Sequence, residues 1–209
     1  MSSREEVLGR IRTALGETRA PVPEVRRDYR RAEDSATETA PLDLLVERIE
    51  DYRADVLRCA ADDVGATVAA ALDRGLGAGW TTSGVVVAPG LPAAWRPAGC
   101  DVDDERPAPE LAERAASVTA VAVAIAETGT LVLDGSPACG RRALSLLPDV
   151  LVCVVTADQV VSGVPEGIAR LDPLRPLTMI SGPSATSDIE LERVEGVHGP
   201  RSLLVVLAD

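Results

Sequence analysis

The sequence predicts an α/β domain, with a mostly parallel central sheet flanked by helices, that follows an N-terminal helical arm. Segments with helical spacing of apolar residues alternate with short continuous apolar runs, the pattern of strand–helix–strand units. The longest run, residues 117–126, is largely Val, Ala and Ile, as expected for a central strand covered on both faces. Because aromatic residues make up 2% of the chain and Phe is absent, the predicted core is aliphatic.

The arm is predicted to span residues 1–40 and the α/β domain residues 41–209, a length sufficient for one full core. Residues 3–15 place their apolar side chains on one helical face, with Ser3 and Glu6 as a capping box and Gly16 as the end. The linker that follows is rich in Pro, Arg and acidic residues. The arm helix packs either on another subunit, which includes the case of a homo-oligomer, or on its own domain.

Within the domain, apolar spacing and turn residues predict five helices and eight strands. Pro41 suits the first turn of a helix, Val64, Val68 and Leu72 share one helical face, and Pro89-Gly90 closes a strand. The predicted helices span residues 41–52, 62–74, 109–116, 141–147 and 164–171. The predicted strands span residues 54–59, 84–88, 101–102 (an edge strand), 117–126, 130–133, 150–156, 177–180 and 203–207.

Composition and charge exclude several classes of function. A net charge of −12 and few aromatic residues argue against nucleic-acid binding. The chain contains no Lys, so it can form neither a Schiff base nor a Walker A loop, and it has no G-x-G-x-x-G fingerprint. Its four cysteines are scattered without a C-x-x-C pair, which predicts reduced structural thiols and no cofactor or metal in this chain.

The sequence gives no sign of export or of a membrane span. The first residues lack the apolar core of a signal peptide, and no run approaches about 18 consecutive apolar residues. We therefore expect a cytoplasmic protein.

The first candidate for chemistry is the turn Glu127-Thr128-Gly129-Thr130, which follows the most apolar run. A carboxylate at a strand end, flanked by two hydroxyls, suits a general base or a hydrogen-bond anchor. The alternative is a hairpin turn whose threonine hydroxyls bind backbone groups.

The second candidate is the polar stretch after the apolar run 177–180. If that run is a strand of an open α/β sheet, the stretch lies at its carboxyl end, where ligands gather. A hydroxyl-rich loop with Gly182 offers free N–H groups to an anion, especially if a helix begins within it. Helix capping by Ser184 or Ser187 would explain the same residue types.

The third candidate contains the only histidine of the chain, His198, within Gly196-Val-His-Gly-Pro200. A histidine titrates near neutral pH and can act as an acid or base, although a structural histidine fits the pattern equally well. Arg141 and Arg142 could face an anion, but a solvated pair is the favoured interpretation. Glu127 and His198 are therefore the catalytic candidates. The ligand-binding candidates are Thr128, Gly129, Thr130, Gly182, Pro183, Ser184, Thr186, Asp188, Glu190 and Gly199.

These motifs resemble the LUD-domain family. The matching stretches are residues 125–133, 177–190 and 196–200, and the resemblance covers residues 54–209. It implies a fold like those of ribose-5-phosphate isomerase, CoA transferases and formyltetrahydrofolate cyclo-ligase. It also implies a role in bacterial oxidation of L-lactate to pyruvate beside two iron–sulfur proteins, with this chain as the subunit without an iron–sulfur cluster.

Two hypotheses follow. In the first, the chain belongs to a lactate-oxidising assembly, and its loops bind a small anionic ligand or the partner subunits. In the second, it is a free-standing isomerase or transferase that acts on a phosphorylated or CoA-linked substrate, with Glu127 as base or nucleophile. The absence of lysine weighs against a sugar-phosphate isomerase.

Overall fold

The structure, a computed structural model, describes residues 2–16, 23–29, 40–77, 79–186, 194–195 and 199–209. The helices of this part of the chain are α1 (Ser3–Leu15), α2 (Pro41–Asp51), α3 (Val64–Leu76), α4 (Ala108–Ala112) and α5 (Val164–Ala169). Short 3₁₀ turns connect several elements. Those near the site are η5 (Ala126–Thr128) and η6 (Arg142–Ser145).

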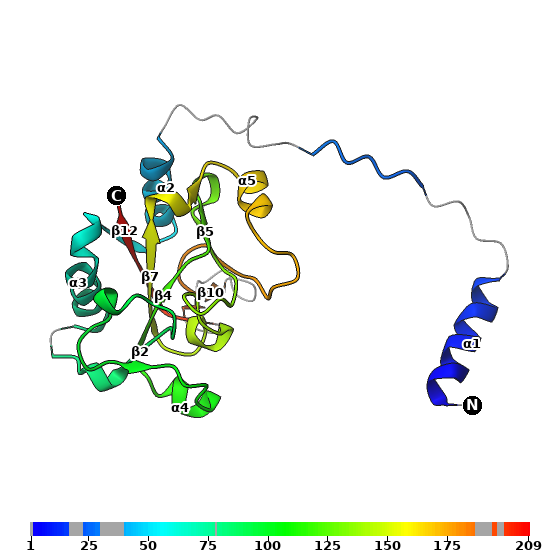
Figure 1. The fold of residues 1–209 in the computed structure, drawn as a ribbon, viewed down its shortest axis with the longest axis horizontal. Coiled ribbons are helices and arrows are strands. Elements are labelled where there is room, and N and C mark those ends of the chain that lie inside the picture. Colours follow the sequence, from blue (N-terminus) through cyan, green and yellow to red (C-terminus); the bar gives the residue numbers. More distant parts are fainter. Residues whose placement is uncertain (1, 17–22, 30–39, 78, 187–193, 196–198) are drawn as a thin grey trace.

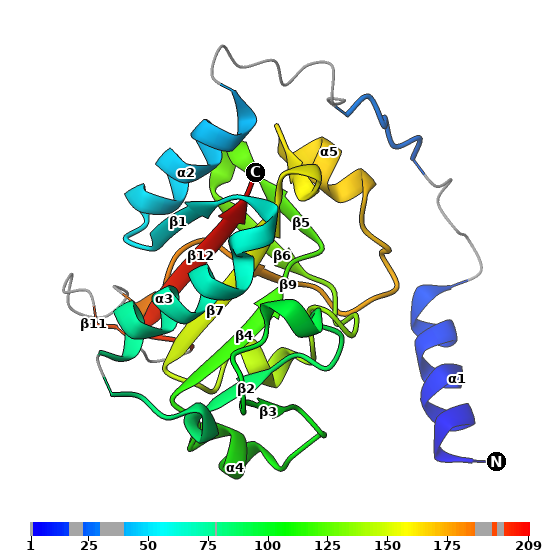
Figure 2. The same ribbon diagram turned by 60° about the vertical axis from the view of Figure 1, so that its left-hand side comes forward.

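The main sheet has six strands among the described residues, in the order β1-β12-β7-β4-β2-β3, and every pairing between neighbours is parallel. Figure 2 shows this sheet with α3 lying across one face. Its strands are β1 (Asp55–Cys59), β2 (Val85–Val87), β3 (Asp101–Val102), β4 (Ala116–Ala120), β7 (Val150–Thr156) and β12 (Ser202–Ala208). The predicted α/β fold with a mostly parallel sheet and flanking helices is therefore confirmed, and residues 101–102 form an edge strand as expected.

Both faces of the main sheet are covered. The predicted inward residues of α3, Val64, Val68 and Leu72, are buried against it in one apolar cluster. On the opposite face, Leu45 and Ile49 of α2 belong to a second cluster that lies between the main sheet and a smaller sheet. Strands such as β7 and β12 can be apolar at consecutive positions because neither of their faces meets water.

The smaller sheet has the order β8-β5-β6-β9. Its strands are β5 (Val123–Ile125), β6 (Thr130–Leu133), β8 (Val160–Val161) and β9 (Thr178–Ile180). β6 pairs antiparallel with both β5 and β9, so the turn between β5 and β6 is a hairpin. A further antiparallel pair joins β10 (Ala185–Thr186) and β11 (Val194–Glu195).

The prediction of one central strand over residues 117–126 was wrong. The run is divided between β4 in the main sheet and β5 in the smaller sheet, and the chain changes sheets at Val121 and Ala122. The Ala120 N–H donates to the Ala138 carbonyl and the Ala122 N–H to the Val132 carbonyl, so the crossing keeps its backbone hydrogen bonds. Both halves are buried, and apolar periodicity does not distinguish one long buried strand from two short ones.

Two local predictions also differ from the structure. The helix expected over residues 141–147 is only the 3₁₀ turn η6. The capping box of α1 is formed by Ser2 and Glu5 rather than Ser3 and Glu6. Pro41 does open α2, and Gly16 does end α1.

The arm helix α1 lies away from the α/β domain (Figure 1) and contains no buried residue. Its apolar side chains Val7, Ile11 and Leu15 are exposed. Docking of α1 on its own domain is therefore not observed, and packing on another subunit stays a prediction. In the part of the chain that the structure describes, no helix is long and apolar enough to cross a membrane.

Candidate functional site

The first two sequence motifs meet where β6 and β9 lie side by side. The Thr130 hydroxyl is 2.8 Å from the hydroxyl of Ser181, which follows β9. The Thr128 hydroxyl lies 2.7 Å from that of Thr130 and extends the chain of hydroxyls into the hairpin turn. Each of these oxygens can donate or accept, so the three form one polar cluster between the two motifs.

The third motif joins them through its last residues. The Ser184 N–H donates to the Pro200 carbonyl at 2.8 Å. A Cβ atom placed on Gly199 would lie 3.4 Å from the Ser184 Cβ, so the two chain segments are in contact. His198, Gly196, Asp188 and Glu190 lie outside the described residues. Thr186 belongs to β10, which shows that the chain enters a strand after Ser184 rather than a helix capped by it.

Two motif glycines let the loops pack directly on α2 and on Tyr52, the residue that follows it. Gly129 has a φ of 60°, and a Cβ there would lie 2.9 Å from the Arg48 carbonyl carbon. Gly182 has a φ of 85°, and a Cβ there would lie 2.7 Å from the Tyr52 Cβ. Since a side chain would be both strained and in collision at either position, these glycines hold the site against α2.

A cavity of about 230 Å³ lies beside this junction. Its floor includes Leu151 and Leu203, near the amino ends of β7 and β12. The backbone of residues 181–184 and the polar side chains Arg142 and Ser145 form other walls. A second cavity of about 170 Å³ shares Arg142, Ser145 and Thr178 with the first. The two therefore adjoin along the edge of β9.

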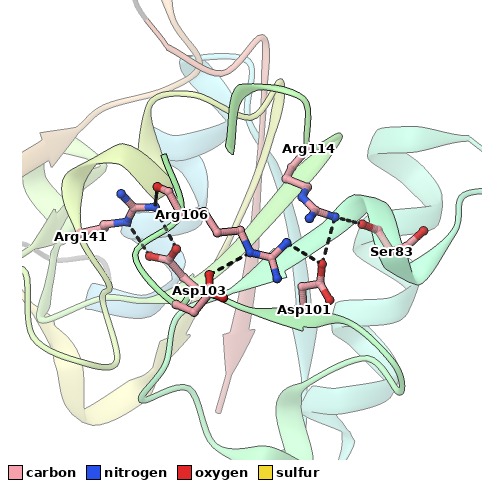
Figure 3. Close-up of polar contacts among 7 residues, drawn as sticks. Ser83, Asp101, Asp103, Arg106, Arg114 and Arg141 are labelled. Carbon is pink, nitrogen blue, oxygen red and sulfur yellow. Dashed lines mark hydrogen bonds and ion pairs between the residues drawn. The ribbon is translucent and has the colours of Figure 1, made fainter. Parts of the chain in front are cut away.

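Two neighbouring arginines have different surroundings. Arg141 forms a bidentate ion pair with Asp103, in which Nε lies 2.6 Å from Oδ2 and Nη2 lies 2.9 Å from Oδ1. It also donates to the Arg106 carbonyl. Figure 3 shows the Arg141 guanidinium directed at the Asp103 carboxylate, whose side chain is 3% exposed. Hydrogen bonding to Asp103 raises the pKa of Arg141.

Figure 3 also shows a second group of ion pairs, around Asp101. Arg106 and Arg114 both contact one Asp101 oxygen, at 2.9 and 3.0 Å, and Arg114 also donates to the Ser83 carbonyl. Side-chain hydrogen bonding lowers the pKa of Asp104, which contacts Arg106. These cations are paired and belong to the scaffold.

Arg142 is exposed and lines both cavities. Within the described residues its guanidinium has no carboxylate partner. Its backbone is fixed, because the Ser145 hydroxyl donates to the Arg142 carbonyl at 3.0 Å and the Ser117 hydroxyl to the Leu144 carbonyl at 2.7 Å. A guanidinium next to hydroxyls and backbone N–H groups can bind a small anion.

Comparison with known proteins gives the family. A model of the LUD domain matches residues 94–208. This range includes the three motifs, and it includes Arg142 and Ser145, which line both cavities. The chain belongs to the LUD domain family. A protein of Deinococcus radiodurans named lactate utilization protein C is 47% identical over 168 residues, covering 77% of this chain and 76% of that protein. One of the same name from Macrococcus caseolyticus is 31% identical over 109 residues, 48% of this chain and 47% of that protein.

A solved structure confirms the fold of this LUD domain. The crystal structure of a DUF162 family protein from Deinococcus radiodurans superposes with a TM-score of 0.66 at 39% sequence identity. The superposition covers 81% of this chain and 96% of that one.

Glu127 occupies a different place from the cavities of the LUD domain. It is exposed, its N–H donates to the Ser162 carbonyl, and its side chain lines neither cavity. Among the described residues its carboxylate has no hydrogen bond or ion pair. The hairpin interpretation of this turn is thus what the backbone shows, while the catalytic assignment stays a prediction.

Two cysteines of the LUD domain are buried thiols. Burial raises the pKa of Cys153 to about 12 and also raises that of Cys139. Burial therefore favours the protonated thiol over the thiolate at both positions. Among the described residues, no group of three or more His, Cys, Asp or Glu side chains is placed to hold a metal ion.

Sequence reasoning missed Ser145 and Thr178 as wall residues and favoured a solvated role for Arg142. The sequence does carry one signal, the glycine at position 140 before two arginines. Gly140 has a φ of 69°, and a Cβ there would lie 3.2 Å from that of Ala88. After this close turn Arg141 binds Asp103 and lines the second cavity, while Arg142 lines both cavities.

Proposed function

We propose that this LUD domain protein is a component of a bacterial lactate utilization system that oxidises L-lactate to pyruvate. Family membership and the relatives named lactate utilization protein C, one of them 47% identical, support the role in lactate utilization. The observation that carries a ligand-binding role is the junction of the three motifs beside a cavity that holds Arg142.

In this proposal the chain is the cytoplasmic subunit without an iron–sulfur cluster, and two iron–sulfur proteins are its partners. The cavity would bind the small anion, and the exposed apolar face of α1 would contact a partner subunit. The arm (residues 1–40) and the α/β domain (residues 41–209) are then two functional parts.

The experiment is a pull-down of the tagged protein from lactate-grown cells, with iron analysis and lactate-oxidation assays of the eluate. Recovery of iron–sulfur proteins with activity is the expected result. A variant with Val7, Ile11 and Leu15 changed to Ser tests the arm, and it should lose the partners without losing the folded domain. A solitary, iron-free protein that turns over a phosphorylated or CoA-linked substrate would instead establish the free-standing enzyme.

A further inference from the structure

We infer that Arg142 is the anchor of a binding site for a short-chain 2-hydroxy or 2-oxo carboxylate, formed by the two adjoining cavities along β9. The inference rests on the proposed function for the choice among small anions. The site itself follows from charge, geometry and size.

The charge argument begins with the contrast between adjacent arginines. Arg141 is neutralised by the buried Asp103, and its Nε and Nη2 atoms bind that carboxylate and the Arg106 carbonyl. Arg142 has no carboxylate partner within the described part of the chain, although the sequence contains 33 acidic and only 21 basic residues. Since no described carboxylate compensates this guanidinium, it makes the cavity a local positive site that an anion can neutralise.

The geometry holds Arg142 in place without using its side chain. At one end of the turn, the Leu144 N–H donates to the Arg141 carbonyl and Arg141 is clamped to Asp103. At the other end, Ser117 binds the Leu144 carbonyl and Ser145 binds the Arg142 carbonyl. A guanidinium on a fixed backbone loses less entropy when it binds a carboxylate through two parallel hydrogen bonds.

The cavity walls define the class of ligand. Ser145 is 1% exposed, and its hydroxyl proton is used on the Arg142 carbonyl, so its oxygen remains available as an acceptor for a ligand hydroxyl. Leu151 and Leu203 supply an apolar wall for a short carbon chain. The two cavities, of about 230 and 170 Å³, leave room around Arg142 for a ligand of a few heavy atoms.

The test is calorimetric titration of the purified full-length protein with L-lactate, pyruvate and inorganic phosphate. We expect wild-type protein to bind at least one of the two carboxylates, and Arg142→Gln to weaken that binding about 10- to 100-fold, the loss of a charge-assisted contact. The matched control is Arg74→Gln on α3, an exposed arginine on the other side of the main sheet, which should change Kd less than about twofold. Arg142→Lys should restore part of the affinity.

Two results would overturn the inference. One is equal carboxylate affinity in wild type and Arg142→Gln. The other is the absence of binding of both carboxylates, whether or not phosphate binds in an Arg142-dependent way, which would exclude this class of ligand. Neither result affects the pull-down, so partners recovered from lactate-grown cells would leave the proposed function standing while the site assignment failed. Melting temperature and circular dichroism of each variant confirm that it is folded.

Discussion

The two ends of the parallel sheet differ in how their charges are used. At the carboxyl ends, Asp103 after β3 binds Arg141, and Arg58 of β1 binds Asp209 after β12. At the amino ends of β7 and β12 lies the larger cavity, with Arg142 uncompensated among the described residues. Ion pairs occur at both ends, since Arg201 contacts Asp149 just before β12 and β7. The amino end differs because it also has a cavity lined by a cation without a carboxylate partner in the described structure, and it is the open end of the sheet.

This contrast runs against the general expectation for open α/β sheets, in which ligands bind at the carboxyl ends of the strands. The reason lies in the smaller sheet. β9 ends at Ile180, and its antiparallel pairing with β6 directs the following loop toward the amino ends of β7 and β12. The loop does follow the carboxyl end of a strand, as predicted, but that strand belongs to the other sheet.

The largest effect should come from exchanging the two arginines one at a time for glutamine. Arg141→Gln leaves the Asp103 carboxylate, 3% exposed, without its cation, and we expect a loss of about 3 kcal/mol in the free energy of unfolding. Arg142→Gln removes an exposed side chain without a carboxylate partner in the described structure and should cost less than about 0.5 kcal/mol. Urea unfolding followed by circular dichroism measures both. Equal losses of stability would contradict the distinction between Arg141, which is paired with Asp103, and Arg142, which has no carboxylate partner among the described residues.

A somewhat smaller effect is expected at the loop that forms the open end. Gly182→Ala combines a positive φ with a collision against Tyr52, and we expect a loss of about 2–3 kcal/mol or a displaced loop. Gly77→Ala is the matched control, because Gly77 has a φ of 79° with nothing within 4 Å of an added Cβ. It should cost about 1–2 kcal/mol from backbone strain alone, because its ψ of 165° lies in a region that few residues other than glycine adopt. If both variants lost the same stability, the close contact with Tyr52 would contribute nothing to the loss.

The sequence predicts the elements of this fold better than their grouping. Helical spacing correctly gives the buried face of α3, and the apolar runs give β7 and β12 nearly to the residue. The division of residues 117–126 between two sheets is not predictable from periodicity, because β4 and β5 are both buried on both faces.

The candidate site was predictable in part for a related reason. Glycines and hydroxyls cluster at residues 128–130 and 181–184, and the structure brings these two groups together. The sequence could not show that Arg141 forms an ion pair and Arg142 does not, because the partner, Asp103, lies 38 residues before Arg141 in the chain. Pairing over that distance is a property of the folded sheet and leaves no local pattern.

Asp134, which lies between two residues that line the second cavity, allows a test of a paired carboxylate by pH. Burial would raise the pKa of Asp134, but hydrogen bonds from Ser136 and Arg175 outweigh it and lower the pKa to about 2. A depressed carboxyl pKa stabilises the fold above its unfolded value near 4, and this contribution disappears as the pH falls toward 2. Allowing for solvent screening, Asp134→Asn should lose about 1 kcal/mol at pH 7 and progressively less below pH 4.

Urea unfolding at pH 7, 4 and 3 checks this for wild type and variant. Asp158→Asn serves as the control, because that exposed carboxylate makes no hydrogen bond or ion pair with the described residues. A difference between wild type and Asp134→Asn that stayed constant from pH 7 to pH 3 would contradict the role assigned to the Arg175 ion pair.

The smallest effect on stability is expected at Glu127. A variant at this position tests whether its carboxylate acts in the cavity or on a separate surface of the domain. Glu127→Ala should change the free energy of unfolding by less than about 0.5 kcal/mol, because the side chain is exposed and without a partner in the described structure. It should also leave carboxylate affinity unchanged, because Glu127 lines neither cavity. Growth on lactate should nevertheless be lost if this carboxylate is essential.

Three measurements on Glu127→Ala decide its role: the free energy of unfolding and the carboxylate affinity of the purified protein, and growth on lactate of complemented cells. Loss of growth with unchanged affinity would place the role of Glu127 outside the anion site, on a surface that a partner or a second reactant contacts. Loss of affinity would mean that the hairpin turn and the cavity form one site, linked through Thr128, Thr130 and Ser181. Normal growth with a stably expressed variant would remove Glu127 from the candidates and leave the open end of the sheet, with Arg142, as the functional region.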